Sequence, residues 1–364
     1  MPTPTTVPIF FSVDDGYVPC LAVALTSIRA NKNPRVNFEI NILNNGLLPA
    51  NQKRLAALGT SNFDIRFIAM DKVTRQISGD TNKLRGDYVT MTIYFRLFIA
   101  DMFPQYDKVI YIDADTVAED DLTTLFATDL GDNLVAGVAD PVMMTYPETM
   151  TYIQRDFGIQ PGKYINSGVL VMNLAQMRQE HFSDRFLHLL KTYHFTMIAA
   201  DQDYINVIAQ HRIKYLPKLW NMQTGVPAAA EAGGKLIHYN LFGKPWHYHH
   251  AKLGDRFWRY APDSGFEAEL KQQLAAFTLA DQQADRQSMS GMLQTAIDVC
   301  HTENTILNAV KHGEQVALWN RAGLSVRIAR KLLAIFGVRW RLKRLILKLK
   351  NMIRCFPSRR SSGL

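Results

Sequence analysis

The chain has 364 residues, of which 47% are hydrophobic and 20% charged, enough for one large domain or two smaller ones with a substantial core. No run reaches the roughly 18 uninterrupted apolar residues of a membrane-spanning helix, and the N-terminus lacks a basic segment followed by a long apolar run, so we expect neither a span nor export. The three cysteines, Cys20, Cys300 and Cys355, have no pairing or metal-binding spacing, which is typical of a reducing cytoplasm.

The net charge of +8 comes from one end of the chain. Residues 321–364 hold 13 Lys or Arg and no Asp or Glu, which leaves 28 basic and 33 acidic residues in 1–320. The body is therefore acidic, and this argues against a nucleic-acid-binding protein.

The N-terminal third alternates between apolar runs and stretches with helical spacing. An alternation of this kind predicts a parallel sheet covered by helices. The expected elements are strands over 7–13, 36–43 and 63–68, and helices over 17–30 and 49–58.

The most informative segment is Asp113-Ala114-Asp115, which directly follows the predicted strand 108–112. A helix over 92–102 leads into this strand, so the two carboxylates are expected at the carboxyl edge of the sheet, where ligands of open α/β sheets bind. Two carboxylates one residue apart can turn toward one Mn²⁺ or Mg²⁺ and leave coordination positions for phosphate oxygens. A solvated turn after the strand is the alternative.

Beyond Asp140 the pattern loosens, with apolar runs at 168–172 and 214–216. We expect an α/β domain with a mixed sheet over residues 1–262. Residues 263–320 are expected to form a helical extension, since 267–320 is rich in Gln, Ala and Met. Residues 321–364 are expected to form a separate basic tail.

Two further clusters suit a nucleotide sugar, and each has a plain structural alternative. Asp14 and Tyr17 follow the first strand, where they could contact a uracil base or serve as a helix cap and a core aromatic. Asn166 is expected in a turn before an apolar strand, and Gly168 would let a ligand approach the backbone or would only punctuate the strand.

Polar residues near two later segments also suit a phosphorylated ligand. Asp201-Gln202-Asp203 precedes apolar positions at helical spacing, so at least one aspartate is expected to cap a helix. His238 is a candidate metal ligand and Lys244 a candidate phosphate contact, although a histidine in an aromatic segment is often a packed core residue.

Together these motifs resemble glycosyltransferase family 8, which includes bacterial lipopolysaccharide galactosyl- and glucosyltransferases. The resemblance spans about residues 7–262 and implies the GT-A type nucleotide-sugar fold, a Rossmann-like mixed sheet flanked by helices. It rests on Phe11-Ser-Val-Asp-Asp-Gly-Tyr17, Thr92-Ile-Tyr-Phe-Arg-Leu97, Tyr111-Ile-Asp-Ala-Asp115, Tyr164-Ile-Asn-Ser-Gly168, Asp201-Gln-Asp203, His238-Tyr239 and Lys244-Pro-Trp-His247.

The resemblance implies roles for individual residues. It makes Asp113, Asp115 and His238 the ligands of Mn²⁺. The residues implied for the nucleotide and its diphosphate are Asp14, Tyr17, Arg96, Asp113, Ala114 and Lys244. Those implied for the transferred sugar and the reaction centre are Asp140, Asn166, Asp201 and Gln202.

Two positions depart from the family pattern on the donor side. Gly16 stands where the family often has Asn, and Leu241 stands where a glycine usually approaches the diphosphate. The resemblance also implies retention of anomeric configuration, by front-face attack or through a covalent intermediate. We favour front-face attack because Gln202, the nearest candidate nucleophile, is an amide.

The tail carries an apolar stripe at intervals of three and four residues, surrounded by Lys and Arg, which predicts a basic amphipathic helix. We expect it to hold the protein on an anionic membrane surface, at the cytoplasmic face of the bacterial inner membrane. Nucleic-acid binding by the clustered positive charge and packing on the body are the alternatives. The stripe consists of Leu342, Leu345, Leu349, Met352 and Phe356.

The sequence thus predicts a UDP-galactose- or UDP-glucose-dependent hexosyltransferase whose acceptor is a lipid-linked saccharide such as a lipopolysaccharide core. A non-catalytic module that binds UDP-sugar or membrane is the second hypothesis.

Overall fold

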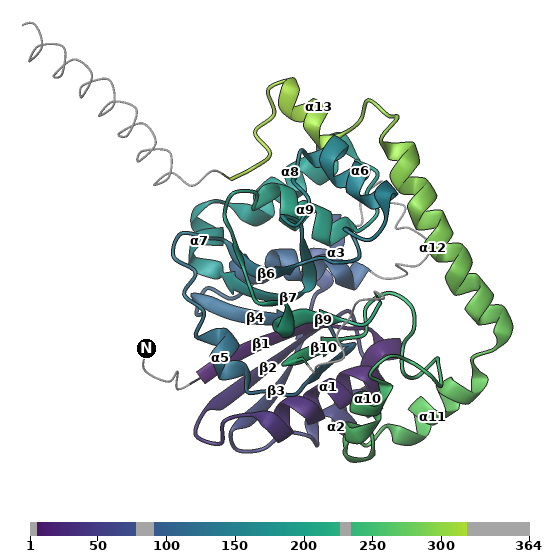
Figure 1. The fold of residues 1–364 in the computed structure, drawn as a ribbon. Helices are drawn as coiled ribbons and strands as arrows, with labels where there is room; N and C mark the ends of the chain where they lie inside the picture. Colours follow the sequence, from purple (N-terminus) through teal and green to yellow (C-terminus); the bar gives the residue numbers. More distant parts are fainter. Residues whose placement is uncertain (1–5, 78–90, 226–233, 319–364) are drawn as a thin grey trace, which may run out of the picture. The chain divides into compact units, whose positions relative to one another are not determined.

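A computed structural model describes residues 6–77, 91–225 and 234–318, all of which lie within the compact unit Met1–Leu318. The centre of this unit is a seven-stranded sheet (Figure 1). In spatial order its strands are β3 (Phe63–Ala69), β2 (Asn37–Asn44), β1 (Thr6–Ser12), β4 (Lys108–Ile112), β7 (Ile165–Asn173), β6 (Val135–Ala139) and β8 (Ile213–Tyr215).

The sheet is mixed, as the sequence predicts, because one strand runs against the rest. Strands β1 to β4 pair in parallel, β7 is antiparallel to both β4 and β6, and β6 is parallel to β8. The first residues of β7 therefore meet the carboxyl ends of β4 and β6. This reversal places the start of one strand at the edge where ligands of α/β sheets bind.

Both faces of the sheet are buried, so its central strands carry apolar residues at successive positions. In β1, Phe10 packs into one core cluster while Ile9 and Phe11 pack into the cluster on the other face. The strand β4 begins and ends where the sequence predicts it.

Helices cover both faces of the sheet (Figure 1). On the face of Ile9 lie α1 (Val18–Asn31), α2 (Pro49–Ala56) and α5 (Leu122–Phe126). On the face of Phe10 lie α3 (Asp71–Ile77), the 3₁₀ helix η2 (Met91–Phe98), α4 (Ile99–Met102), α6 (Pro147–Phe157), α7 (Leu174–Gln179), α8 (Phe182–Tyr193) and α9 (Ala200–Ile208).

Two elements differ from the sequence prediction. The helix expected over 92–102 is mostly a 3₁₀ helix, with only one α-helical turn at its end. Asn166, expected in a turn, is the second residue of β7, so that prediction was wrong. Strand β7 begins early because Ile165 still pairs with Ala139 of β6 beyond a register shift.

A second, three-stranded sheet lies beside the carboxyl end of β4. Its middle strand β10 (Leu236–His238) pairs with β5 (Thr116–Ala118) and with β9 (Met222–Gln223). The 3₁₀ helices η1 (Asp15–Tyr17) and η3 (Lys218–Asn221) precede α1 and β9. This small sheet connects the segment after Asp113 to His238.

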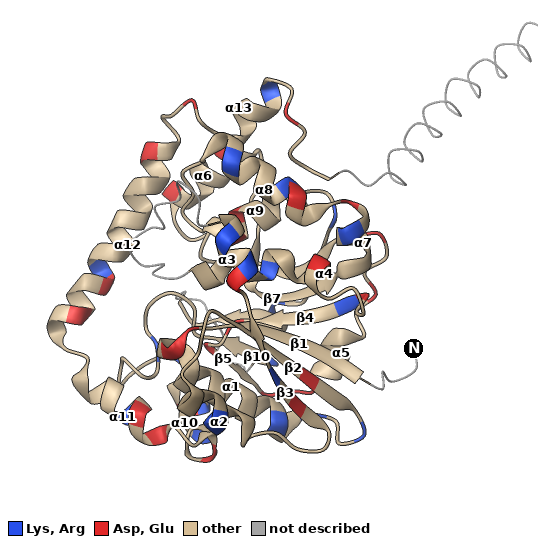
Figure 2. Cartoon of the chain, turned by 180° about the vertical axis from the view of Figure 1, so that it is seen from behind, with Lys and Arg blue, Asp and Glu red and all other residues tan. Residues whose placement is uncertain are grey.

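The C-terminal part of the unit is helical. It comprises α10 (Gly254–Tyr260), the 3₁₀ helix η4 (Pro262–Ser264), α11 (Glu267–Ala276), α12 (Leu279–Val299) and α13 (Ile306–Lys311). A capping box formed by Thr278 and Asp281 begins α12, and Tyr248 donates to Asp285 at 2.7 Å. This helix carries three aspartates and one arginine (Figure 2).

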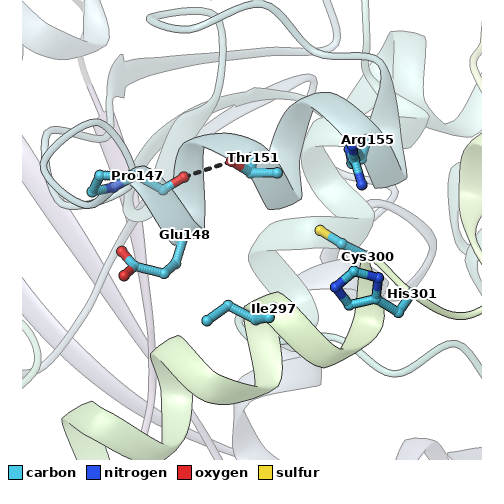
Figure 3. A pocket seen from close by; sticks show the side chains of 7 residues that line it. All are labelled: Pro147, Glu148, Thr151, Arg155, Ile297, Cys300 and His301. Atoms are coloured by element: carbon cyan, nitrogen blue, oxygen red, sulfur yellow. Dashed lines mark hydrogen bonds between the residues drawn. The ribbon is translucent and has the colours of Figure 1, made fainter.

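The C-terminal half of α12 packs against α6. A cavity of about 220 Å³ lies in this seam, lined by residues that include Glu148, Arg155, Cys300 and His301 (Figure 3). It is formed by residues of α6, by the end of α12 and by the two residues that follow α12, and it contains none of the predicted site residues.

Among the described residues, no helix is both long and apolar enough to cross a membrane. The predicted amphipathic tail, residues 321–364, lies outside the described residues, as do positions 319 and 320 of the predicted helical extension.

Candidate functional site

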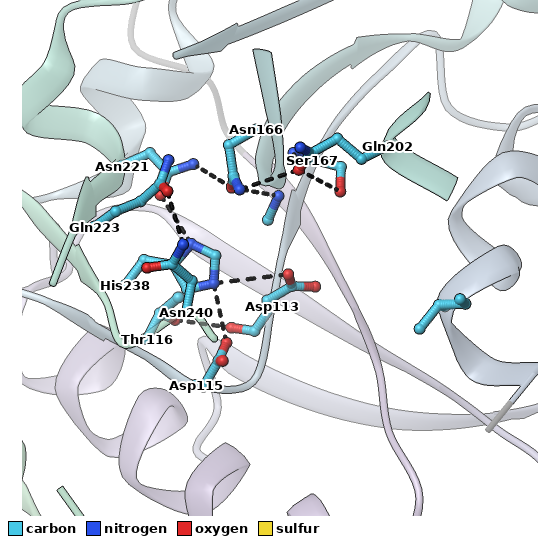
Figure 4. A network of polar contacts seen from close by, with 12 residues as sticks. Asp113, Asp115, Thr116, Asn166, Ser167, Gln202, Asn221, Gln223, His238 and Asn240 are labelled. Carbon is cyan, nitrogen blue, oxygen red and sulfur yellow. Dashed lines mark hydrogen bonds and ion pairs between the residues drawn. The ribbon is translucent and has the colours of Figure 1, made fainter. Parts of the chain in front are cut away.

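The predicted metal ligands come together where β7 starts and β4 ends. Asp113 follows β4, and its backbone N–H donates to the carbonyl of Gly168 at 2.8 Å. His238 lies on β10 opposite Thr116 of β5, which places its ring beside Asp115. One ligand atom from each of Asp113, Asp115 and His238 lies within 4.8 Å of the others (Figure 4).

The imidazole edge faces both carboxylates. His238 Nε2 is 3.2 Å from Asp115 Oδ1 and 3.8 Å from Asp113 Oδ2. Gly168 makes this approach sterically feasible, since a Cβ there would lie 2.2 Å from His238 Cε1 and 2.7 Å from Asp113 Oδ2. The sequence predicts that a bound ligand approaches Gly168, whereas in this structure the space beside it is taken by two candidate metal ligands.

These residues fit a divalent cation. Two carboxylates and one imidazole are a mixed oxygen and nitrogen donor set that suits Mn²⁺, and carboxylate oxygens also suit Mg²⁺. The Asp113 side chain is 26% exposed, whereas His238 is buried, so a ligand can reach the cluster from the Asp113 side.

Each carboxylate also has a cationic partner. Arg96 donates from a terminal nitrogen to Asp113 Oδ1 at 2.9 Å, and Lys244 Nζ donates to Asp115 Oδ2 at 2.5 Å. Burial alone would raise the pKa of Asp115, but Lys244 and His238 outweigh it and hold that pKa well below the usual range. Burial would lower the pKa of Lys244, yet Asp115 keeps it above its ordinary value.

Arg96 is almost fully enclosed. Besides Asp113, its guanidinium contacts Asp201 Oδ2 at 3.1 Å and the carbonyl of Ser167 at 2.9 Å, and it lies over the ring of Tyr111. Burial would lower the pKa of Arg96, but the carboxylates outweigh it and raise that pKa. Arg96, predicted as a phosphate contact, thus holds the Asp113 carboxylate in this structure.

A buried network of Asp140, Asn166 and Gln202 adjoins the cluster. Asp140 Oδ2 accepts hydrogen bonds from Asn166 Nδ2 at 3.1 Å and from Gln202 Nε2 at 3.0 Å. Gln202 Oε1 accepts from Asn166 Nδ2 at 3.0 Å and from the N–H of Ser167 at 2.9 Å. Burial raises the pKa of Asp140, and its hydrogen bonds oppose that shift.

The two aspartates of the Asp-Gln-Asp segment, at the start of α9, have different roles. Asp203 accepts the backbone N–H of Ala199 at 2.9 Å and the hydroxyls of Tyr152 and Tyr164, so it ties the start of the helix to the core. Asp201 accepts from Ser167 Oγ at 3.0 Å and faces Arg96. The prediction that one aspartate would serve the helix terminus fits Asp203.

The remaining residues predicted for the donor side follow β1, β4 and β10. Asp14 Oδ1 accepts the N–H of Tyr17 at 3.3 Å and caps η1, while the Tyr17 side chain is partly exposed. Ala114 is buried between the two metal-ligating candidates. Leu241 has a φ of 57°, the left-handed backbone that glycine favours, so this departure from the family pattern retains a glycine-like backbone.

Sequence reasoning missed two residues of this site. Asn221 accepts from His238 Nδ1 at 2.9 Å, and Ser167 contacts Asp201 and Arg96. Ser167 stands inside a motif that the sequence singles out. Asn221 follows Trp220 in an unremarkable segment, and only the pairing of β9 with β10 brings it to the imidazole.

Comparisons with known proteins identify the family of this chain. Residues 8–250 match the profile of glycosyl transferase family 8. A lipopolysaccharide 1,2-glucosyltransferase of Escherichia coli is 26% identical over 258 residues, which cover 66% of this chain and 74% of that protein. The crystal structure of the galactosyltransferase LgtC with donor and acceptor sugar analogs has a TM-score of 0.60 and 26% identity, covering 71% of this chain and 96% of that one.

Some relatives extend well beyond the matched region. The apo structure of the bifunctional glycosyltransferase WbbM has a TM-score of 0.67 and 27% identity, and the match covers 76% of this chain but 53% of that one. A Haemophilus influenzae protein is 26% identical over 217 residues, which make up 63% of its length. The profile match extends over more than half of the chain and includes the predicted metal-ligand cluster, so this protein belongs to glycosyl transferase family 8.

Proposed function

We propose that this protein is a retaining, Mn²⁺-dependent hexosyltransferase that moves galactose or glucose from a UDP-sugar to a lipopolysaccharide core or a related glycan. The observation that carries the proposal is the cluster of Asp113, Asp115 and His238 beside the buried network around Asp140. The names of two relatives, a lipopolysaccharide glucosyltransferase and a galactosyltransferase, support the choice of hexose and acceptor.

Asp113, Asp115 and His238 would hold the cation, and Arg96 would keep Asp113 in place from behind. A divalent cation bound there supplies Lewis-acid stabilisation to the diphosphate of the donor. Lys244, protonated and buried, adds a fixed positive charge where the UDP leaving group develops negative charge. Asp14 and Tyr17 would contact the uracil, because both follow β1 on the same edge of the sheet.

Asp140, Asn166 and Gln202 would orient the transferred sugar. Their hydrogen bonds to one another hold them in place before a ligand arrives, so little reorganisation is needed on binding. Asp201 would act indirectly, by holding the Arg96 and Ser167 side chains in place.

The contacts of Gln202 favour front-face attack. Its Oε1 already accepts hydrogen bonds from Asn166 and Ser167, so it is a poor nucleophile even by the standard of an amide. The acceptor oxygen would bond to the anomeric carbon on the face that the phosphate oxygen vacates. The hydroxyl proton would pass to an oxygen of the departing UDP. A glycosyl adduct on Gln202 or Asp201, found by mass spectrometry with a slow donor, would overturn this mechanism.

The domain assignment is part of the proposal. Residues 1–262 would form the catalytic domain and 263–320 a helical extension. Residues 321–364 would bind anionic lipid at the cytoplasmic face of the inner membrane, near a lipid-linked acceptor. The acidic body makes nucleic acid a poor alternative partner for this tail.

Donor hydrolysis tests the proposal without knowledge of the acceptor. Purified protein would be incubated with UDP-galactose, UDP-glucose or their N-acetyl forms, with Mn²⁺ or with EDTA, and released UDP measured. Metal-dependent release from one of the two hexose donors is expected. Binding of UDP-sugar without release, even with crude lipopolysaccharide added, would favour the non-catalytic module.

A further inference from the structure

The second nitrogen of the His238 ring has its own buried partner. His238 Nδ1 is 2.9 Å from Oδ1 of Asn221, the last residue of η3 (Figure 4). Both side chains are almost fully buried, so water does not compete readily for this contact. The hydrogen bond at Nδ1 bears directly on which nitrogen can offer a lone pair to a cation.

The backbone N–H of Gly168 sets the orientation of two side-chain amides, those of Asn166 and Asn221, which lead to this contact. The N–H of Gly168 donates to Asn166 Oδ1 at 2.9 Å, and a backbone N–H needs an oxygen as its partner. The same oxygen accepts from Asn221 Nδ2 at 2.8 Å. With its nitrogen committed to Asn166, Asn221 can present only its oxygen to the imidazole.

The order of donors and acceptors then determines the tautomer of His238. Because Asn221 offers an oxygen, His238 Nδ1 must carry the hydrogen of that bond. The lone pair of the neutral ring is then on Nε2, the nitrogen that faces Asp113 and Asp115. A ligating histidine commonly has its tautomer set in this way by the partner of its other nitrogen.

We propose that Asn221 is a positioning residue for the cation site. It holds His238 with Nε2 free to bind the metal, and its own orientation is set by Asn166. Since Asn166 Nδ2 also contacts Asp140 and Gln202, the proposed sugar site and the metal-ligating imidazole share one chain of hydrogen bonds. The inference rests on the proposed function, because it assumes a cation at the cluster.

Three variants test the proposal by metal binding rather than by turnover. Asn221→Leu removes the acceptor and keeps the branching of the side chain at Cγ, and Asn221→Asp keeps an oxygen opposite His238. Asn41→Leu is the matched control, because Asn41 is equally buried in β2 and donates to the carbonyl of Glu39. The readout is the Kd of Mn²⁺ in saturating UDP, measured by electron paramagnetic resonance.

We expect Asn221→Leu to weaken Mn²⁺ binding about 10- to 100-fold, as removal of a ligand's hydrogen-bond partner commonly does. Asn221→Asp should bind Mn²⁺ at least several-fold more tightly than Asn221→Leu, and Asn41→Leu should match the wild type. Equal affinity in Asn221→Leu and the wild type would overturn the proposal. So would an Asn221→Asp variant as weak as the leucine variant.

If Asn221→Leu does not fold, a measurement on the wild type tests the proposal instead. With ¹⁵N-labelled histidine and diamagnetic Mg²⁺ plus UDP, the Nδ1–H of His238 should exchange slowly with water, because it is buried and bonded. Fast exchange would contradict the proposal. If the wild type bound no divalent cation with UDP, the proposed function itself would fail. If the wild type bound Mn²⁺ and Asn221→Leu bound it equally well, only the proposed role of Asn221 would fail.

Discussion

Lys244 donates from Nζ to Asp115 Oδ2 at 2.5 Å, so the lysine proposed for the diphosphate holds a carboxylate proposed for the cation. Arg96 holds Asp113 in the same manner at 2.9 Å. The acidic pair is therefore balanced by two protein cations. A divalent cation that enters alone must compete with Lys244, whereas one that enters with a diphosphate brings a new partner for the lysine.

This competition predicts opposite effects of removing Lys244. In Lys244→Met, Mn²⁺ alone should bind several-fold more tightly, because Asp115 loses its competitor, while UDP in the presence of Mn²⁺ should bind more weakly. Both constants can be measured by calorimetry. The control is Lys235→Met, which removes a partly exposed lysine 2.6 Å from Asp120. If Mn²⁺ alone bound more weakly to Lys244→Met than to the wild type, competition between Lys244 and the cation for Asp115 would be contradicted.

The absence of a side chain at Gly168 gives a second prediction. Gly168→Ala would place a methyl group 2.2 Å from His238 Cε1 and should lower Mn²⁺ affinity at least tenfold, because the ring must move. Gly291→Ala is the control, since no atom lies within 4 Å of its added carbon in α12. It should leave Mn²⁺ binding unchanged and stabilise the protein by up to about 1 kcal/mol. Normal metal binding by a folded Gly168→Ala variant would refute the packing argument.

Asp156 in α6 predicts a pH dependence of stability. Its Oδ1 is buried without a hydrogen-bond partner among the described residues, and burial raises the pKa of Asp156 to about 7. The folded state then holds a proton that the unfolded state releases near pH 4, so this residue's contribution is complete below pH 4 and is lost as the pH rises to about 7.

Denaturant unfolding of Asp156→Asn across pH 4 to 8 checks this sign. Relative to the wild type, the variant should gain stability as the pH rises, by up to about 4 kcal/mol at pH 8, since each unit of pKa corresponds to about 1.4 kcal/mol. A constant difference between the two proteins over this pH range would show that the Asp156 carboxyl does not titrate as stated.

Removal of residues 321–364 tests the proposed membrane contact. Each Lys or Arg near an anionic bilayer contributes about 1 kcal/mol, so the truncated protein should no longer sediment with vesicles rich in phosphatidylserine at low salt. Vesicles of phosphatidylcholine alone are the control for the full chain. Unchanged sedimentation after truncation would reject the lipid interpretation, and tight binding of the full chain to duplex DNA would favour the nucleic-acid one.

The sequence predicts the elements that periodicity and charge make visible. Strand β4 and the two aspartates after it were located correctly because a continuous apolar run ends at acidic residues. The start of β7 was misplaced because Asn166 and Gly168 resemble turn residues, whereas pairing with β6 extends the strand through them. Asn221 has no such local signal, since its role arises only from the contact between segments far apart in the chain.

The roles of charged residues depend even more on the fold. Lys244 and Arg96 were both predicted as phosphate contacts from their motifs, but only the structure shows that each holds an aspartate of the cluster. The sequence identifies which side chains carry charge. It does not identify their partners, because those partners lie 17 and 129 residues away along the chain.

Calorimetric titration of UDP into the wild type, Asp113→Asn and Asp115→Asn, each with and without Mn²⁺, tests the central claim most directly. A shared cation between the carboxylates and the diphosphate requires that Mn²⁺ tighten UDP binding to the wild type at least tenfold and that either substitution abolish most of this gain. Equal UDP affinity with and without Mn²⁺ in the wild type, or an undiminished gain in both variants, would contradict it.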